Sequence, residues 1–113
     1  MLMLKLEKKS LANLKKTLEN EYGISIRNIK RVPGFYDANF IIQTSRSRFF
    51  VKVYGFDKLP AIQFQASLIE FLYQANMPVG KLIRAKKDAQ YFKFQNTYGI
   101  VQSFIDGQKL GDR

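Results

Sequence analysis

Two stretches of the chain have apolar residues at the three- and four-residue spacing of an amphipathic helix. The first follows Ser10, which is a favoured N-cap type, and ends before Gly23, a typical C′ residue, so we expect a helix over residues 10–22. The second begins at Pro60, which suits a first helical turn, and its broad apolar stripe continues to about Asn76. Both helices need an apolar surface to cover.

Elsewhere the apolar residues mostly alternate with polar ones, as in half-buried strands. Turn-forming residues separate six such segments. The expected strands are residues 24–32, 38–44, 48–54, 82–85, 91–94 and 98–105. This order predicts a single α+β domain over residues 1–113, with an antiparallel sheet of five or six strands, an N-terminal helix and one helix after the third strand. We expect both helices on one side of the sheet.

The composition excludes several kinds of chemistry. The 113 residues include no Cys and no His, which excludes disulfide frameworks, thiolate zinc sites, Cys nucleophiles and imidazole bases. The opening residues Met1–Leu6 are charged too soon for a signal peptide, and no apolar run approaches the roughly 20 residues that span a bilayer. We therefore expect a cytoplasmic protein with no membrane segment.

The net charge of +10 raises the question of a nucleic-acid or phosphate ligand. The basic residues fall in pairs along the whole chain and form no dense cluster, which favours solvated faces. These pairs are Lys8 with Lys9, Lys15 with Lys16, Lys30 with Arg31, Arg46 with Arg48, and Lys86 with Lys87.

Lys52 lies in a predicted strand between two aromatic residues. Strand alternation puts Phe50, Lys52 and Tyr54 on one face, and Val51 and Val53 on the other. Such a lysine either extends its stem over apolar surface with its ammonium in water, or presents that ammonium to an anion.

Two further segments are weak signals by themselves. The loop Gly34–Asn39 joins the first two strands and begins with a glycine, so its backbone N–H groups can approach a polyphosphate, although an ordinary hairpin has the same pattern. The segment Ile100–Gly107 is an apolar strand that runs into an Asp-Gly turn.

Taken in order, these segments resemble the N-terminal lobe of the aminoglycoside phosphotransferase and homoserine kinase (type II, choline-kinase-like) superfamily, which has a protein-kinase-like fold. Gly34–Thr44 resembles that family's Gly-x-x-Asn-x-Asn-Tyr-x-Val-x-Thr strand pair, and Arg48–Tyr54 resembles its third strand. Leu72–Val79 resembles the helix end before a Pro-Val step, and Ser103–Gly107 resembles the hinge. The resemblance covers about residues 10–110.

The resemblance implies that the chain binds ATP. Lys52 would hold the α- and β-phosphates, the loop Gly34–Asn39 would cover them, and backbone groups of Ser103 and Ile105 would bind the adenine. The implied ATP-binding residues are Gly34, Asp37, Asn39, Lys52, Gln65, Ser103 and Ile105, with Ile42, Val51 and Phe104 lining the adenine pocket.

The sequence departs from the family at two points. Gln65 stands where the family has a Glu that pairs with the strand lysine, so Lys52 loses a charge-assisted partner. The family's catalytic Asp and its Mg²⁺ ligands come from a C-terminal lobe with a His-Gly-Asp motif, which these 113 residues lack. We therefore expect the ATP-binding lobe of a phosphotransferase that acts on a small-molecule hydroxyl, inactive alone, with no catalytic residue or metal ligand of its own. Its exposed hinge side should self-associate or dock a partner lobe.

Two alternatives remain open. Gln65 favours a catalytically dead, kinase-like protein with a structural or scaffolding role. The other alternative is a basic module that binds single-stranded nucleic acid and stacks its bases on aromatic side chains, namely Tyr36, Tyr91, Phe92 and Phe94. No RRM-like Lys/Arg-Gly-Phe/Tyr run is present, which counts against it.

Overall fold

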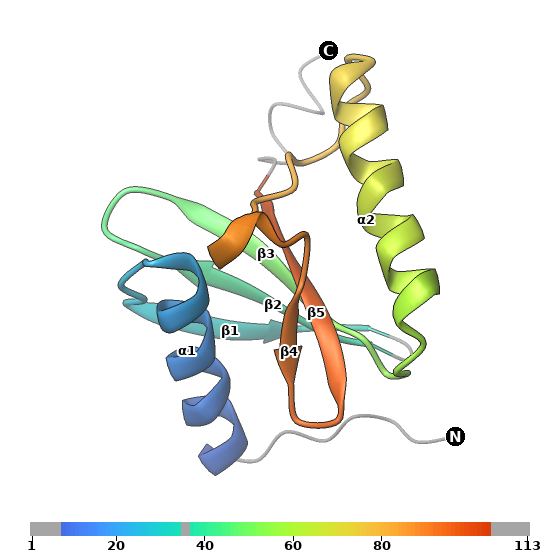
Figure 1. Ribbon diagram of the computed structural model, residues 1–113. Coiled ribbons are helices and arrows are strands. Elements are labelled where there is room, and N and C mark those ends of the chain that lie inside the picture. Colours follow the sequence, from blue (N-terminus) through green and yellow to red (C-terminus); the bar gives the residue numbers. More distant parts are fainter. Residues whose placement is uncertain (1–7, 35–36, 105–113) are drawn as a thin grey trace.

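The computed structural model describes residues 8–34 and 37–104 (Figure 1). It contains two α-helices, five strands and one short 3₁₀ helix in these residues. In chain order the elements are α1 (Lys8–Tyr22), β1 (Asn28–Val32), β2 (Ala38–Gln43), β3 (Arg48–Val53), α2 (Leu59–Gln74), η1 (Lys86–Asp88), β4 (Phe92–Phe94) and β5 (Thr97–Ser103). The expected C′ residue of α1, Gly23, has φ +64° and donates its N–H to the Glu19 carbonyl at 3.0 Å.

The five strands form one antiparallel sheet in the order β1-β2-β3-β5-β4. β3 is central, and its Lys52 lies opposite Asn39 of β2 and Ile100 of β5. The predicted antiparallel sheet with one helix before it and one after the third strand is confirmed.

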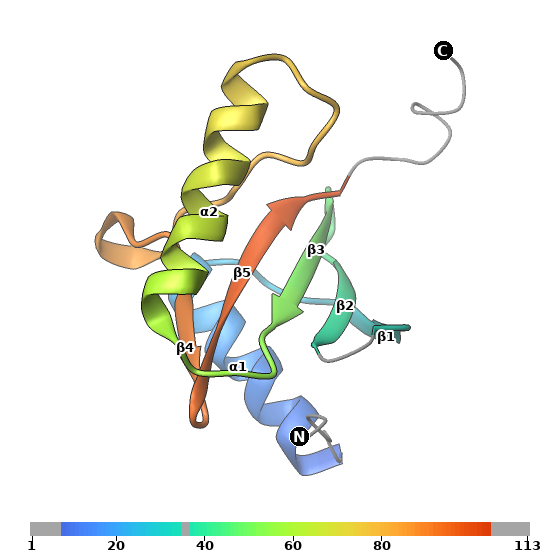
Figure 2. The same ribbon diagram turned by 90° about the vertical axis from the view of Figure 1, so that its right-hand side faces the viewer.

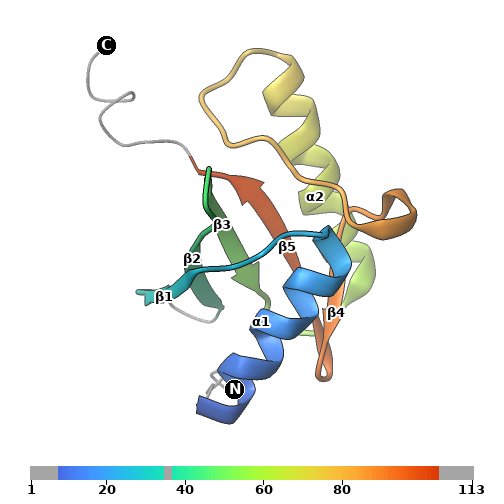
Figure 3. The same cartoon turned by 90° about the vertical axis from the view of Figure 1, so that its left-hand side faces the viewer.

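The two helices pack on opposite faces of the sheet, so the expectation that both lie on one side is wrong (Figures 1 and 3). α1 places Leu14 and Leu18 in a core that includes Val51 and Val53 of β3. α2 packs on the other face, where its buried residues contact Tyr54 and Ile100. The reason is that β3 and β5 carry apolar side chains on both faces, and each face needs its own cover.

Residues 82–85 do not form the predicted strand. Leu82 makes a single bridge with Gln102, and Ile83 donates its N–H to the Val101 carbonyl at 2.8 Å. The chain then turns away, because the Ala85 N–H bonds to the Ala89 carbonyl at 2.8 Å and closes the turn around η1.

The first strand is shorter than the period-two pattern predicts. Before β1, the Ile26 N–H donates to the Glu19 carboxylate of α1 at 2.9 Å, so this backbone group bonds to a helix side chain. Pairing with β2 begins at Asn28.

α2 buries a narrower stripe than its apolar content suggests. Ile62 and Ala66 are buried, whereas Phe64, Leu68 and Phe71 are 68%, 42% and 66% exposed. Figure 2 shows α2 beside β5, on the β4–β5 side of the sheet. Among the described residues, neither helix combines the length and apolarity that crossing a membrane requires.

Candidate functional site

Lys52 lies on the sheet face that α2 partly covers. Strand alternation and pairing place the side chains of Asn39, Phe50, Ile100 and Gln102 on the same face. Val51 and Val53 are fully buried on the opposite face, which confirms the predicted facing of β3. About a third of the Lys52 side chain (32%) is exposed, so its ammonium is accessible from solution.

Asp37, at the end of the Gly34 loop, is the carboxylate partner of Lys52. Its Oδ2 atom lies 3.9 Å from Lys52 Nζ, and its Oδ1 atom accepts the Gly55 N–H at 2.9 Å. The carboxylate therefore joins the loop to the residues that follow β3, beside the lysine.

Gln65 contacts the site through Tyr54 rather than through an observed bond to Lys52. The Tyr54 hydroxyl donates to Gln65 Oε1 at 2.9 Å, and Lys52 Nζ lies 5.8 Å from the centre of the Tyr54 ring. Burial, and secondarily the charge of Asp37, raises the pKa of Tyr54 to about 12, so this hydroxyl keeps its proton at neutral pH. We call Asp37, Lys52, Tyr54 and Gln65 the lysine cluster.

The Gly34 loop is closed on itself. Asn39 Nδ2 donates to the Pro33 carbonyl at 3.3 Å, across the loop. A Cβ atom at Gly34 would overlap the Asn39 amide and the Asp37 carbonyl, so this close approach requires glycine. The structure thus brings Gly34, Asp37 and Asn39 together near Lys52, while residues 35–36 lie outside the described part.

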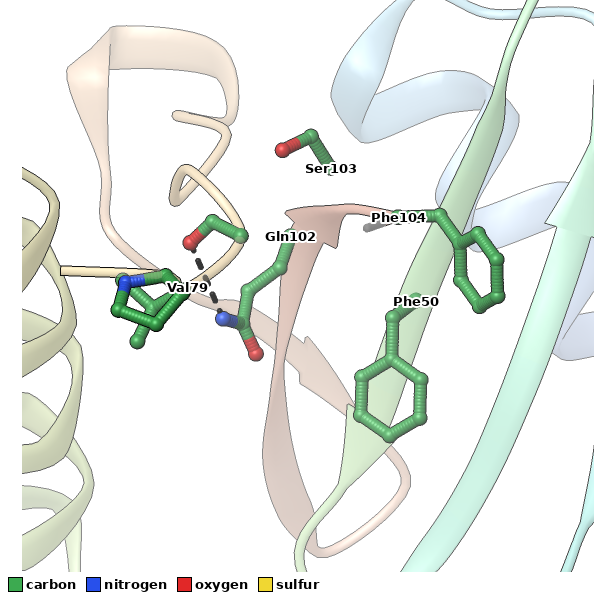
Figure 4. Close-up of a pocket in the computed structure, with 7 residues that line it drawn as sticks. Phe50, Val79, Gln102, Ser103 and Phe104 are labelled. Carbon is green, nitrogen blue, oxygen red and sulfur yellow. Dashed lines mark hydrogen bonds between the residues drawn. The ribbon is translucent and has the colours of Figure 1, made fainter. Parts of the chain in front are cut away.

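A surface pocket of about 280 Å³ lies on the same face, and Phe50, two residues from Lys52 on β3, is one of its lining residues. Gln102 Nε2 donates a hydrogen bond to the Gly80 carbonyl at 3.2 Å, drawn as the dashed line in Figure 4. The pocket is lined by Phe50, Pro78, Val79, Gly80, Gln102, Ser103 and Phe104.

The segment before the pocket is tied to the end of β5. The Ser103 N–H donates to the Lys81 carbonyl, and the Lys81 N–H donates to Ser103 Oγ, each at 2.8 Å. A Cβ atom at Gly80 would overlap the Ser103 carbonyl. Because the Ser103 amide is already engaged, only its carbonyl can serve the predicted adenine contact.

Two of the three residues expected to line an adenine pocket do not lie on the face of Lys52. Ile42 and Val51 are fully buried in the core beneath α1, on the face opposite Lys52. Phe104 does line the pocket, together with Phe50, which the sequence interpretation missed although it lies two residues from Lys52 and so shares its face. The predicted contact of Ile105 lies outside the described residues.

The aromatic residues offered for base stacking are mostly unavailable. Phe92 and Phe94 are buried in the core, and Tyr91 packs edge-on against Tyr98 with ring centres 5.5 Å apart. Tyr36 lies outside the described residues. The stacking surface required by the nucleic-acid alternative is therefore not formed by β4.

Within residues 8–34 and 37–104, no group of three or more Asp, Glu, His or Cys side chains gathers as a metal site would require. The described residues provide a cation, a glycine loop and a pocket, but no carboxylate-rich metal centre.

No protein-family model matches the sequence, and no curated protein matches it. Its fold is similar to that of a solved phosphotransferase. The crystal structure of the spectinomycin phosphotransferase APH(9)-Ia, in complex with ADP and spectinomycin, matches 83% of this chain with a TM-score of 0.68 and 17% identity. The fold is a protein-kinase-like N-lobe. The match spans 29% of the phosphotransferase chain, so most of that protein has no counterpart here.

Proposed function

We propose that this chain binds the phosphates of ATP with Lys52 and the Gly34 loop, as the nucleotide-binding lobe of a phosphotransferase that acts on a small-molecule hydroxyl. The observation that carries the proposal is the accessible Lys52 ammonium beside a glycine loop, on a sheet face that continues into a pocket. A similar fold in a phosphotransferase solved with ADP supports it.

In this proposal the pocket takes the adenine. The rings of Phe50 and Phe104 offer apolar contact, and the Ser103 carbonyl offers an acceptor for the exocyclic amine. Lys52 then meets the α- and β-phosphates as a point charge, and backbone N–H groups of the loop Gly34–Asn39 cover them.

Mg²⁺ and the hydroxyl substrate would need residues beyond the described ones. We propose that their ligands and the catalytic base belong to a C-terminal lobe, in a cytoplasmic protein. The 113 residues alone should then convert ATP to ADP no faster than the uncatalysed background, whether or not a hydroxyl acceptor is added.

NMR titration with ADP tests the binding proposal. We expect chemical-shift changes at Phe50, Lys52 and Gln102, and their loss in Lys52→Ala. Lys93→Ala is the matched control, because Lys93 is an exposed strand lysine on β4. Equal weakening of ADP binding by both substitutions would reduce the effect to net charge and refute the site.

One observation favours a catalytically dead, kinase-like scaffold as the second candidate. Gln65 bonds Tyr54, and the carboxylate at Lys52 comes from Asp37. The charge pair that the family has between the helix and the strand lysine is therefore replaced by a pair between the Gly34 loop and β3. A scaffold that has lost nucleotide binding would give no shift changes with ADP at any concentration.

A further inference from the structure

The outer side of α2 carries a continuous apolar stripe in addition to its buried stripe. Ala61, Phe64, Leu68 and Phe71 of α2 and its C-cap residue Ala75 are spaced by three and four residues, and all are exposed. We call these five residues the outer stripe. At 100° per residue this stripe lies about half a turn from the buried Ile62 and Ala66. A helix that is apolar on two opposite sides is typical of one covered on both sides.

We infer that the outer stripe is the contact surface for a second copy of this chain, through antiparallel pairing of the two α2 helices. The spacing is nearly symmetric about Leu68, with a Phe and then an Ala on either side. An antiparallel two-fold pair therefore places Leu68 against itself and Phe64 against Phe71 of the other copy. Such self-complementarity is what an isologous interface requires.

The charge distribution favours this surface over others for a contact between two copies. The chain carries +10, so most contacts between copies bring cations together. α2 holds one charged residue, Glu70, and Arg84 already binds it at 2.7 and 2.9 Å. The outer stripe itself is uncharged, and antiparallel helices align their dipoles favourably.

The exposed area predicts a weak dimer. A Phe side chain buries about 150–250 Å², so two rings about two-thirds exposed offer on the order of 200–330 Å² per copy. A standard interface takes roughly 800 Å² from each partner. The association should therefore depend on concentration, and it requires no nucleotide.

Sedimentation equilibrium of the 113-residue chain tests whether the dimer forms. Protein concentrations from about 10 μM to about 1 mM bracket the dissociation constants expected of small interfaces. The mass should rise from 13.2 kDa towards twice that value and stop there. Phe64→Glu should weaken the dimer at least about tenfold, because it places a carboxylate in an apolar contact. Gln63→Glu, the matched control on an exposed neighbour about 100° round the helix, should not.

Mixing two variants tests the antiparallel register. Phe64→Glu and Phe71→Lys should each remain monomeric alone and form a dimer when mixed, since each charge then meets its opposite across the two-fold axis. If circular dichroism shows that either is unfolded, Leu68→Ser replaces it in the single-variant comparison. A wild-type chain that stays at 13.2 kDa, a mass that grows beyond twofold, or equal weakening by Gln63→Glu would overturn the inference.

Discussion

Asp37 lies beside Lys52, where the proposed site would place an anionic phosphate. The ion pair between Asp37 and Lys52 should therefore lower the affinity for ADP by a measurable amount. At 3.9 Å and an effective dielectric constant of about 20, the two charges attract by about 4 kcal/mol before desolvation and side-chain entropy are counted. The side chains are 32% and 23% exposed, so solvent screening reduces the net value to about 0.5–1 kcal/mol.

Asp37→Asn should therefore strengthen ADP binding by roughly two- to fivefold, because the phosphates no longer displace a carboxylate. The asparagine oxygen can still accept the Gly55 N–H, so the loop should keep its position. Isothermal titration calorimetry with ADP measures the change directly.

The matched control is Asp57→Asn, which changes the net charge equally at an exposed acid on the connection to α2. Affinity in Asp37→Asn that is unchanged, or lower than in Asp57→Asn, would refute the reasoning. A lower value would mean that the carboxylate positions Lys52 for the phosphates rather than competing with them.

Three substitutions test the surroundings of the site. Tyr54→Phe removes the hydrogen bond to Gln65 and should lower the free energy of unfolding by about 1 kcal/mol in urea titrations; no change would mean that water replaces the bond at no cost. Gly80→Ala forces a Cβ atom against the carbonyl at the end of β5 and should cost about 1–3 kcal/mol, measured the same way, whereas a neutral result would contradict the close approach. Hydrogen bonds from Arg84 lower the pKa of Glu70, so its contribution to stability is complete above the ordinary value of 4.5 and is lost as the pH falls through the lower folded value. Glu70→Gln should flatten the pH dependence of thermal unfolding below pH 4.5, and a profile identical to that of the wild type would exclude this pair as its source.

Sequence patterns predicted the structural features that depend only on residues close together in the chain. The cap at Gly23 follows from the left-handed conformation that glycine adopts readily, and the facing of Lys52 follows from strand alternation. The same alternation would have excluded Val51 from the pocket. Antiparallel pairing of β2 with β3 then excludes Ile42 as well, since it shares the buried face.

The remaining features of the site depend on contacts between distant segments. The Asp37 carboxylate reaches Lys52 because the Gly34 loop closes through Asn39, and Gln65 reaches Tyr54 because α2 crosses that face of the sheet. No residue spacing in the sequence predicts either of these two contacts. The placement of the helices on opposite faces could have been predicted from the sequence. The adjacent Ile100 and Val101 of β5 are both apolar and point to opposite faces, so both faces need a cover.

The reciprocal bonds between Lys81 and Ser103 have a mechanical consequence. They fasten the end of β5 to the segment that leaves α2, so neither can be displaced without pulling the other. A displacement of Ser103 would therefore move Lys81, and with it the chain that leaves the carboxyl end of α2. Because Gln65 of the same helix accepts a hydrogen bond from Tyr54, a shift of α2 would also change the contacts beside Lys52.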